Sequence, residues 1–481
     1  MRFGSSIAVA TCVLFFLFAQ TVGALCIYTA SLAVSTGFHI PVTWCSLVIG
    51  FTGTVYTSLG GLRGVVWTDC VQAVVIVAAP ATIVIKVLWD ARTRQLRPFT
   101  LEDFKPYAFE YKLDFTQDEN VWSCLIGLYW SWIYRAGLDQ VMVQRYMASR
   151  SLPDAKRTAW WGTLLIIAYF LMAAGLGLIM AYWYRDCDPF LAGAISRTDQ
   201  IIPYYVNTHL STFVGFCGIF LAGVVGATTS TISSIINSLA AVTYVEFVAH
   251  FGKPSQNGSI LLPKGLAMVS GTIMSLYAIV VPYMGSAGRV VMVLQNCITS
   301  PFVSLSVLGL VFPCVNTKAA VMAALLGCVW QASYTGLDMT YGVSPHRMPA
   351  ATDGCDLNET VLVKTPETFS MSLAHSRNKQ PIFLISSYWS NFLCTNVTIL
   401  IGVILSLLTD GSKNYKKNLH LTSNWFLKTW VNKGFISDND LNVATAVAKN
   451  EPLLQCSTAI NETVIGDDVR NAGDPGTDRA A

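Results

Sequence analysis

Charged side chains are the scarcest feature of this chain. They make up 12% of its 481 residues, whereas hydrophobic residues make up 53%, and the mean hydropathy is +0.50. A soluble globular domain carries roughly 25% charged residues. The composition therefore excludes a soluble globular protein, and a formal net charge of +3 is too small to indicate a nucleic-acid partner.

Residue groups typical of catalysis or metal binding are also missing. The 13 cysteines form no CxxC motif, and the 6 histidines fall at the ends of apolar runs or between them. An intramembrane metalloenzyme needs histidine or acidic ligands at helical spacing inside its spans. A channel usually shows a filter loop or a repeated pore-lining ring. We therefore expect neither an enzyme nor a channel, and no cofactor.

Long apolar runs dominate what is present. A helix that crosses a bilayer needs about 20 mostly apolar residues. Such runs predict an all-α, polytopic membrane protein with a transmembrane domain at 1–409 and a polar, largely disordered tail at 410–481. The predicted spans are 5–34, 41–60, 65–88, 121–143, 158–184, 210–247, 264–285, 288–312, 317–336 and 382–408.

The first run has an alternative interpretation as a cleavable signal peptide. A signal has an apolar region of only 7–15 residues. The apolar character here continues to Val34, which favours a span.

Basic residues set the predicted orientation. Arg63 and the group around Arg145 fall on one side of the membrane if the first span runs outward, and so do the later lysines up to Lys417. The positive-inside rule then places both chain ends in the cytoplasm. Cys187 and Cys355 lie in external connections, where we expect a disulfide, the alternative being two free thiols too far apart. Asn358 is the sequon in a long external connection and is the predicted glycosylation site.

The sixth predicted span is dense in hydroxyl groups between Ala227 and Ser238. A small hard cation prefers oxygen ligands, which hydroxyls and loosened backbone carbonyls supply without burying a full negative charge. The alternative is helix–helix packing, in which Ser and Thr are common. The run by itself leaves both interpretations open.

Three stretches together resemble the sodium:solute symporter family. They are 56–69 followed by Gln72, 139–149, and the hydroxyl run through Ala240. Weaker similarity occurs at 313–316 and 402–409, so the resemblance extends in family order from the start of the chain to residue 409. The most similar branch contains multivitamin, monocarboxylate and iodide transporters. The chain departs from the family pattern at Asp139, where Asn is more usual, and at Glu246, which lacks the common Glu-Asp pair.

The resemblance implies a LeuT-like core of two inverted five-helix repeats with its site near the midplane. It implies sodium-coupled symport of a small organic anion across the plasma membrane by alternating access. The anion would be a monocarboxylate, or a vitamin such as biotin or pantothenate. Alternatives are a symporter for a neutral solute such as a sugar or polyol, and a transport-dead fragment or regulatory paralogue.

Arg2-Phe3-Gly4 matches the segment that opens the third core helix in this family. By that register, two core helices and a leading helix would precede Met1. The resemblance then implies an N-terminally truncated chain that is inactive by itself.

The resemblance also implies site residues. Sodium, the coupling ion, would bind the hydroxyls of Ser230 and Thr231 and the carbonyl of Ala227. Asp69 matches an acidic residue on the sodium exit path; alternatively it is an interfacial carboxylate that pairs with Arg63.

Two further polar residues lie in the eighth predicted span. Gln295 and Asn296 precede Pro301, which we expect to kink the helix. They could hydrogen-bond substrate or, alternatively, a neighbouring helix.

Arg135 is the most unusual residue of the predicted spans. It lies about two helical turns from the cytoplasmic Arg145 and would cost at least ~2.5 kcal/mol at the membrane centre without water or a partner. By family register this position lines the substrate cavity. Its guanidinium could bind a carboxylate through two parallel hydrogen bonds. The alternative is a salt bridge to Asp139, four residues on.

Overall fold

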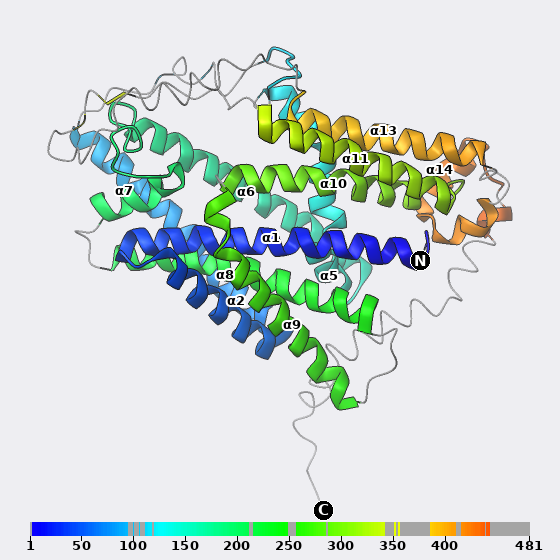
Figure 1. The fold of residues 1–481 in the computed structure, drawn as a ribbon, viewed down its shortest axis with the longest axis horizontal. Helices are drawn as coiled ribbons and strands as arrows, with labels where there is room; N and C mark the ends of the chain where they lie inside the picture. The colour runs from blue at the N-terminus through cyan, green and yellow to red at the C-terminus, as the bar shows by residue number, and fades with distance from the viewer. Residues whose placement is uncertain are drawn as a thin grey trace, which may run out of the picture.

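The structure is a computed structural model, and helices form the regular elements of its described part (Figure 1). It describes residues 2–94, 100, 105, 111–117, 120–210, 215–248, 256–284, 287–341, 351–352, 355, 385–409, 415–437 and 439–442.

Within these residues, eight helical segments are long and apolar enough to cross a membrane. The chain is therefore a multi-pass membrane protein, as the apolar runs predicted. The long helices are α1 (Ser5–Phe38), α2 (Val42–Arg94), α6 (Leu152–Trp183), α8 (Phe216–Thr243), α9 (Gln256–Ala278), α10 (Ala287–Val311), α11 (Thr317–Tyr341) and α13 (Ser387–Leu408). Shorter elements are η3 (Thr198–Gln200), α7 (Ile201–His209), η4 (Tyr244–Val248), η6 (Val281–Met284), η8 (Tyr415–Leu421) and α14 (Asn424–Asn432).

A single glycine divides α2 into two spanning arms, Val42–Gly61 and Gly64–Arg92. Gly61 has φ 56° and ψ −163°, a conformation that is open only to glycine. The chain therefore turns at Gly61 without a long connection, which is why two predicted spans form one kinked element.

The span predicted at 121–143 is not one continuous helix. The structure has η1 (Ser123–Gly127), α4 (Tyr129–Ile133), η2 (Tyr134–Leu138) and α5 (Gln140–Met147) there. Asp139 is extended, with ψ 122°, and its carboxylate accepts a hydrogen bond from the Val141 amide at 3.1 Å. An Asp that caps a new helix in this way ends the preceding turn, so hydropathy predicted the segment and missed its break.

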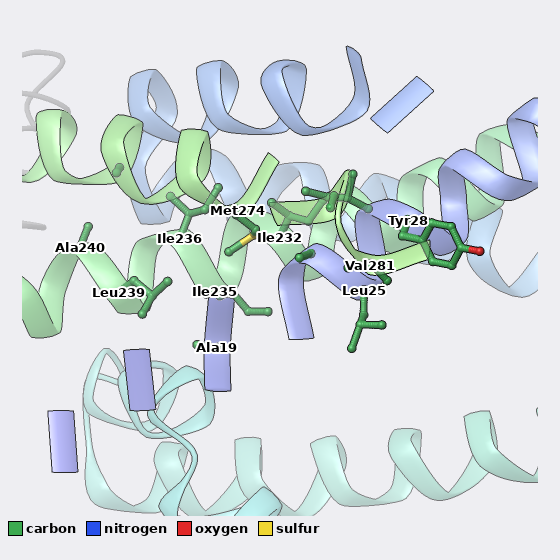
Figure 2. Packing of buried hydrophobic residues seen from close by; sticks show 14 of the residues in the cluster. Ala19, Leu25, Tyr28, Ile232, Ile235, Ile236, Leu239, Ala240, Met274 and Val281 are labelled. Carbon is green, nitrogen blue, oxygen red and sulfur yellow. The ribbon is translucent and has the colours of Figure 1, made fainter. Parts of the chain in front are cut away.

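The main core lies where α1, α8 and α9 pack against one another; Figure 1 shows α8 and α9 beside α1. Figure 2 shows Ile232, Ile236 and Leu239 of α8 packed with Met274 of α9 and with α1. This apolar side of α8 faces the core, which leaves its hydroxyl-bearing positions for other partners. A second bundle consists of α10, α11 and α13, which lie along one another in Figure 1.

The two ends of the described chain meet on one side of the bundle. Arg2 donates hydrogen bonds to the carbonyls of Phe312, Pro313 and Val315 at 3.0–3.2 Å, and to that of Asn418 at 3.4 Å. It therefore caps the C-terminal end of α10 and also holds the segment that contains η8 and α14.

Residues 415–437, within the predicted tail, are folded against the bundle. The Trp430 indole N–H donates to the Val311 carbonyl at 2.8 Å, and Leu427 is buried against Leu419 and Ile436. The Lys416 ammonium and the Tyr415 hydroxyl hold the pKa of the Asp440 carboxyl below its ordinary value. Sequence reasoning missed this segment because its apolar residues occur in groups too short for a membrane span.

At the opposite end, Cys187 and Cys355 are joined in a disulfide with their Cα atoms 4.9 Å apart. The Asp188 amide donates to the Ala351 carbonyl at 3.0 Å beside it. The sequon at Asn358 lies outside the described residues.

Candidate functional site at the junction of α2, α5 and α8

The hydroxyl run of α8 presents Ser230, Ser234 and Ser238 at intervals of four residues. Positions four apart lie on the same face of an α-helix. This face is turned toward α2 and α5, and Ser234 and Ser238 are buried there. The pattern makes α8 a ladder of three hydroxyls in the membrane interior.

Asp69 and Arg145 complete the junction. The Asp69 carboxylate accepts a hydrogen bond from the Ser230 hydroxyl at 2.6 Å and one from Arg145 Nη2 at 3.0 Å. The same Arg145 nitrogen donates to the Ser234 hydroxyl at 2.7 Å. Three helices thus meet through one ion pair and two serines. The side chain of Arg63, the alternative partner of Asp69, lies outside the described residues.

A second layer of hydrogen bonds surrounds this pair. The Ser238 hydroxyl donates to Gln144 Oε1 at 3.2 Å, on the α5 side. On the α2 side, Gln72 donates to the Thr229 hydroxyl at 3.1 Å and the Tyr56 hydroxyl to the Thr229 carbonyl at 2.7 Å. Each of the three sequence stretches that resembled the family therefore contributes to one site.

The three predicted sodium ligands lie next to this junction. The Thr231 hydroxyl is 3.0 Å from the Ala227 carbonyl oxygen, to which it donates. The Ser230 hydroxyl points instead to Asp69. Ala227 and Thr231 thus form one oxygen pair on α8, and Ser230 connects that region to the carboxylate on α2.

Arg135 lies on the π-helical turn η2, just before the break at Asp139. Its Nη1 is 3.7 Å from Asp139 Oδ2, and the exposed fractions of the two side chains are 50% and 9%. A distance of 3.7 Å is longer than a hydrogen bond. The two charges therefore attract each other without the paired hydrogen bonds of a close salt bridge, and the Arg135 guanidinium stays half exposed.

The remaining predicted substrate residues lie on α10. Gln295 is partly buried, one to two turns before Pro301. The side chain of Asn296 lies outside the described residues.

Sequence reasoning missed the roles of Gln144, Arg145, Gln72 and Tyr56 in this junction. In the sequence, Arg145 is only one of several positive charges that the positive-inside rule predicts to be cytoplasmic. One signal in the sequence could have found them, namely the four-residue spacing of the serines. Three hydroxyls on one face of a helix in lipid indicate that the helices packed against this face also carry polar groups.

Fold and site together define a multi-pass helical membrane protein in which the broken segment before α5 meets a hydroxyl-rich helix at a partly buried ion pair. The chain belongs to the sodium:solute symporter family, since its residues 1–327 match that family. This confirms the family expected from the three stretches.

Curated relatives are transporters. The sodium-coupled monocarboxylate transporter 2 of Bos taurus is 28% identical over 421 residues, which cover 86% of this chain and 67% of the relative. The human sodium-coupled monocarboxylate transporter 1 is 28% identical over 449 residues, covering 89% and 73%. The sodium-dependent multivitamin transporter of Oryctolagus cuniculus is 27% identical over 411 residues, covering 82% and 63%.

A solved structure is similar in fold. It is the substrate-bound, outward-open state of a sodium-coupled sialic acid symporter, with a TM-score of 0.63 and 21% identity. The match covers 84% of this chain and 74% of that one. This likeness confirms the predicted LeuT-like helical architecture.

Proposed function

We propose that this chain is a sodium-coupled symporter of a small organic anion that works by alternating access in the plasma membrane. Its ends would face the cytoplasm, and Asn358 would be glycosylated outside. The observation that supports an anionic substrate is the half-exposed guanidinium of Arg135, which lies in a segment that the sequence predicts to cross the membrane. A cation so placed is costly unless it meets water, a partner or a ligand of opposite charge.

The coupling ion, sodium, is a transported substrate of the proposed cycle. Ala227, Ser230 and Thr231 would supply its oxygen ligands from α8. Asp69 would receive the ion on its way to the cytoplasm, and Arg145 would hold the carboxylate when the ion is absent. The hydrogen bond between Ser230 and Asp69 supports this path, because it joins the two regions directly.

The anion would bind Arg135 through paired N–H donors, since a planar guanidinium matches a carboxylate. Gln295 and Asn296 would add neutral hydrogen bonds. The names of the relatives, monocarboxylate and multivitamin transporters, support a substrate that bears a carboxylate.

Uptake by purified chain in proteoliposomes tests the proposal. Radiolabelled lactate, biotin and pantothenate are offered with an inward sodium gradient, and again with potassium in place of sodium. Glucose and myo-inositol are the neutral controls. The proposal, unlike the register-based expectation of a chain that is inactive by itself, requires sodium-dependent uptake of at least one carboxylate and of neither control.

Two other outcomes would contradict the proposal. Sodium-dependent uptake of glucose or inositol alone would show a neutral-solute symporter. A folded chain that takes up none of the five solutes would favour a transport-dead fragment or a regulatory paralogue.

A further inference from the structure

Gln331 of α11 is a buried amide without a partner. Its side chain is 1% exposed, and neither Nε2 nor Oε1 has a hydrogen-bond partner among the described residues. A buried polar atom that is left unpaired has given up its hydrogen bonds to water without replacing them, which destabilises the folded chain. An amide with both ends unpaired therefore indicates a ligand at this position.

The packing of α11 on α13 locates the amide. Cys394 of α13 contacts the Gly327 carbonyl at 3.5 Å, and the Trp330 indole N–H donates to the Ser390 hydroxyl at 3.3 Å. A Cβ at Gly327 would lie 2.7 Å from the Thr398 hydroxyl, so the two helices touch there. This antiparallel register places Gln331 level with residues 390 and 391 of α13.

Asn391 supplies the next unpaired group at that level. It is fully buried, and its Nδ2 donates to the Ser131 hydroxyl of α4 at 2.8 Å, while its Oδ1 has no partner among the described residues. Exchanging the O and N of the amide would still leave one atom unpaired. Asn391 thus connects this level to the broken fourth segment.

The third group comes from α10. The Ser304 hydroxyl lies 3.3 Å from the Thr395 carbonyl of α13. One turn earlier on both helices, which run in parallel, Ser300 lies level with Asn391. Ser300 is fully buried, and its hydroxyl has no partner in the described part of the chain.

We propose that Gln331, Asn391 and Ser300 hold a small cluster of ordered water molecules between α4, α10, α11 and α13. The three groups combine unpaired donors with unpaired acceptors and carry no charge. A bound cation would leave the Gln331 N–H groups facing it, and an anion would face two amide oxygens. Water donates and accepts, and a buried water typically makes two to four hydrogen bonds with such groups.

The cluster goes beyond the proposed symport activity and has a structural consequence. Its waters join α4, which leads into the Arg135 turn, to the peripheral helices α11 and α13. The fourth segment would then be held by exchangeable water bridges as well as by the direct bond between Ser131 and Asn391.

X-ray hydroxyl-radical footprinting of the intact chain in nanodiscs, after rapid mixing into ¹⁸O water, tests the site. Radicals form from bound water and oxidise the side chains beside it. Cys394 lies one turn after Asn391 on α13 and is buried, and Cys45 is a buried cysteine elsewhere. We expect Cys394 to be oxidised at a rate near that of the exposed Cys70 and well above that of Cys45.

A substitution at Gln331 then tests whether the water is bound to the amide of this residue. Gln331→Met should lower oxidation of Cys394 to the level of Cys45, and Gln20→Met, at a buried glutamine of α1, should not. Oxidation of Cys394 no faster than that of Cys45 in the unsubstituted chain would overturn the proposal. So would oxidation that Gln331→Met leaves unchanged. If Gln331→Met does not fold, the unsubstituted chain alone decides.

Discussion

Asp69 and Arg145 lie 76 positions apart in the sequence, yet Arg145 Nη2 is 3.0 Å from Asp69 Oδ2 in the fold. Each is a partly buried charge, and the pair is supported by one further hydrogen bond on each side, from Ser230 to Asp69 and from Arg145 to Ser234. Ser230 is therefore shared between the ion pair and the proposed sodium site. Thr231, its neighbour, belongs to the Ala227 side alone.

Removing either proposed sodium hydroxyl should weaken sodium coupling. In Ser230→Ala and Thr231→Ala we expect the sodium concentration for half-maximal uptake to rise about tenfold, the equivalent of about 1.4 kcal/mol. Surface expression should stay near the unsubstituted level. Thr272→Ala, which removes a hydroxyl bonded only within α9, is the control. Unchanged sodium activation in both site variants would remove these residues from the ion site.

Arg135 and Asp139 allow a double-mutant test. Arg135→Gln should abolish uptake of carboxylates while the chain still folds, because the 3.7 Å contact to Asp139 is too long for a fixed salt bridge. Uptake and size-exclusion profiles are measured for Arg135→Gln, Asp139→Asn and the double variant. If each single change prevents folding and the double change restores it, the salt bridge is the role of Arg135.

At the scale of elements, two interruptions determine the site. The turn at Gly61 brings Tyr56 and Gln72, on different arms of α2, to the same residue of α8. The break at Asp139 separates Arg135 from the α5 helix that carries Gln144 and Arg145. Both are conformations of single residues, which hydropathy does not detect.

The Gly61 turn predicts a specific instability. Gly61→Ala places a Cβ at φ 56° and ψ −163°, and should lower the free energy of unfolding by about 1–3 kcal/mol. Gly64→Ala is the matched control, because Gly64 lies in the following helical arm with open space around it; it should be neutral or stabilising by about 0.5–1 kcal/mol. Thermal unfolding followed by size-exclusion measures both. Equal melting temperatures would show that the turn is not strained.

At the scale of the whole molecule, the two sides of the bundle are secured differently. On one side, the side chains of Arg2 and Trp430 donate hydrogen bonds to the carbonyls of Phe312 and Val311 at the end of α10. On the other, the Cys187–Cys355 disulfide joins the connection after α6 to residues far along the chain. A disulfide on that side is consistent with an extracellular, oxidising environment.

Peptide mapping without reductant should recover Cys187 and Cys355 as one linked pair and Cys70 in alkylated form. Cys187→Ser should lower stability by about 2–5 kcal/mol, because the disulfide closes a long loop. Two separately alkylated peptides for Cys187 and Cys355 would show that the bond does not form.

The sequence by itself determined the class of this protein, most of its spans and its family. Long apolar runs are sufficient for the class and the spans, because a helix in lipid satisfies its own backbone and needs only length and hydropathy; the family followed from the three similar stretches. The hydroxyl run, Asp69 and Arg135 were also visible as polar residues in apolar surroundings, and so was Asp139 as a partner for Arg135. The partners of Asp69 and of the hydroxyl run were not, since a pair such as Asp69 and Arg145 depends on how helices rotate and cross.

Only the tertiary structure decided which side chains meet. It brought the three family-like stretches to one junction, broke the fourth segment at Asp139 and folded residues 415–437 against α10. It also buried Gln331 away from every described partner, although its sequence neighbours are those of an ordinary span. Each of these outcomes depends on packing between distant segments, which the local pattern of a chain does not encode.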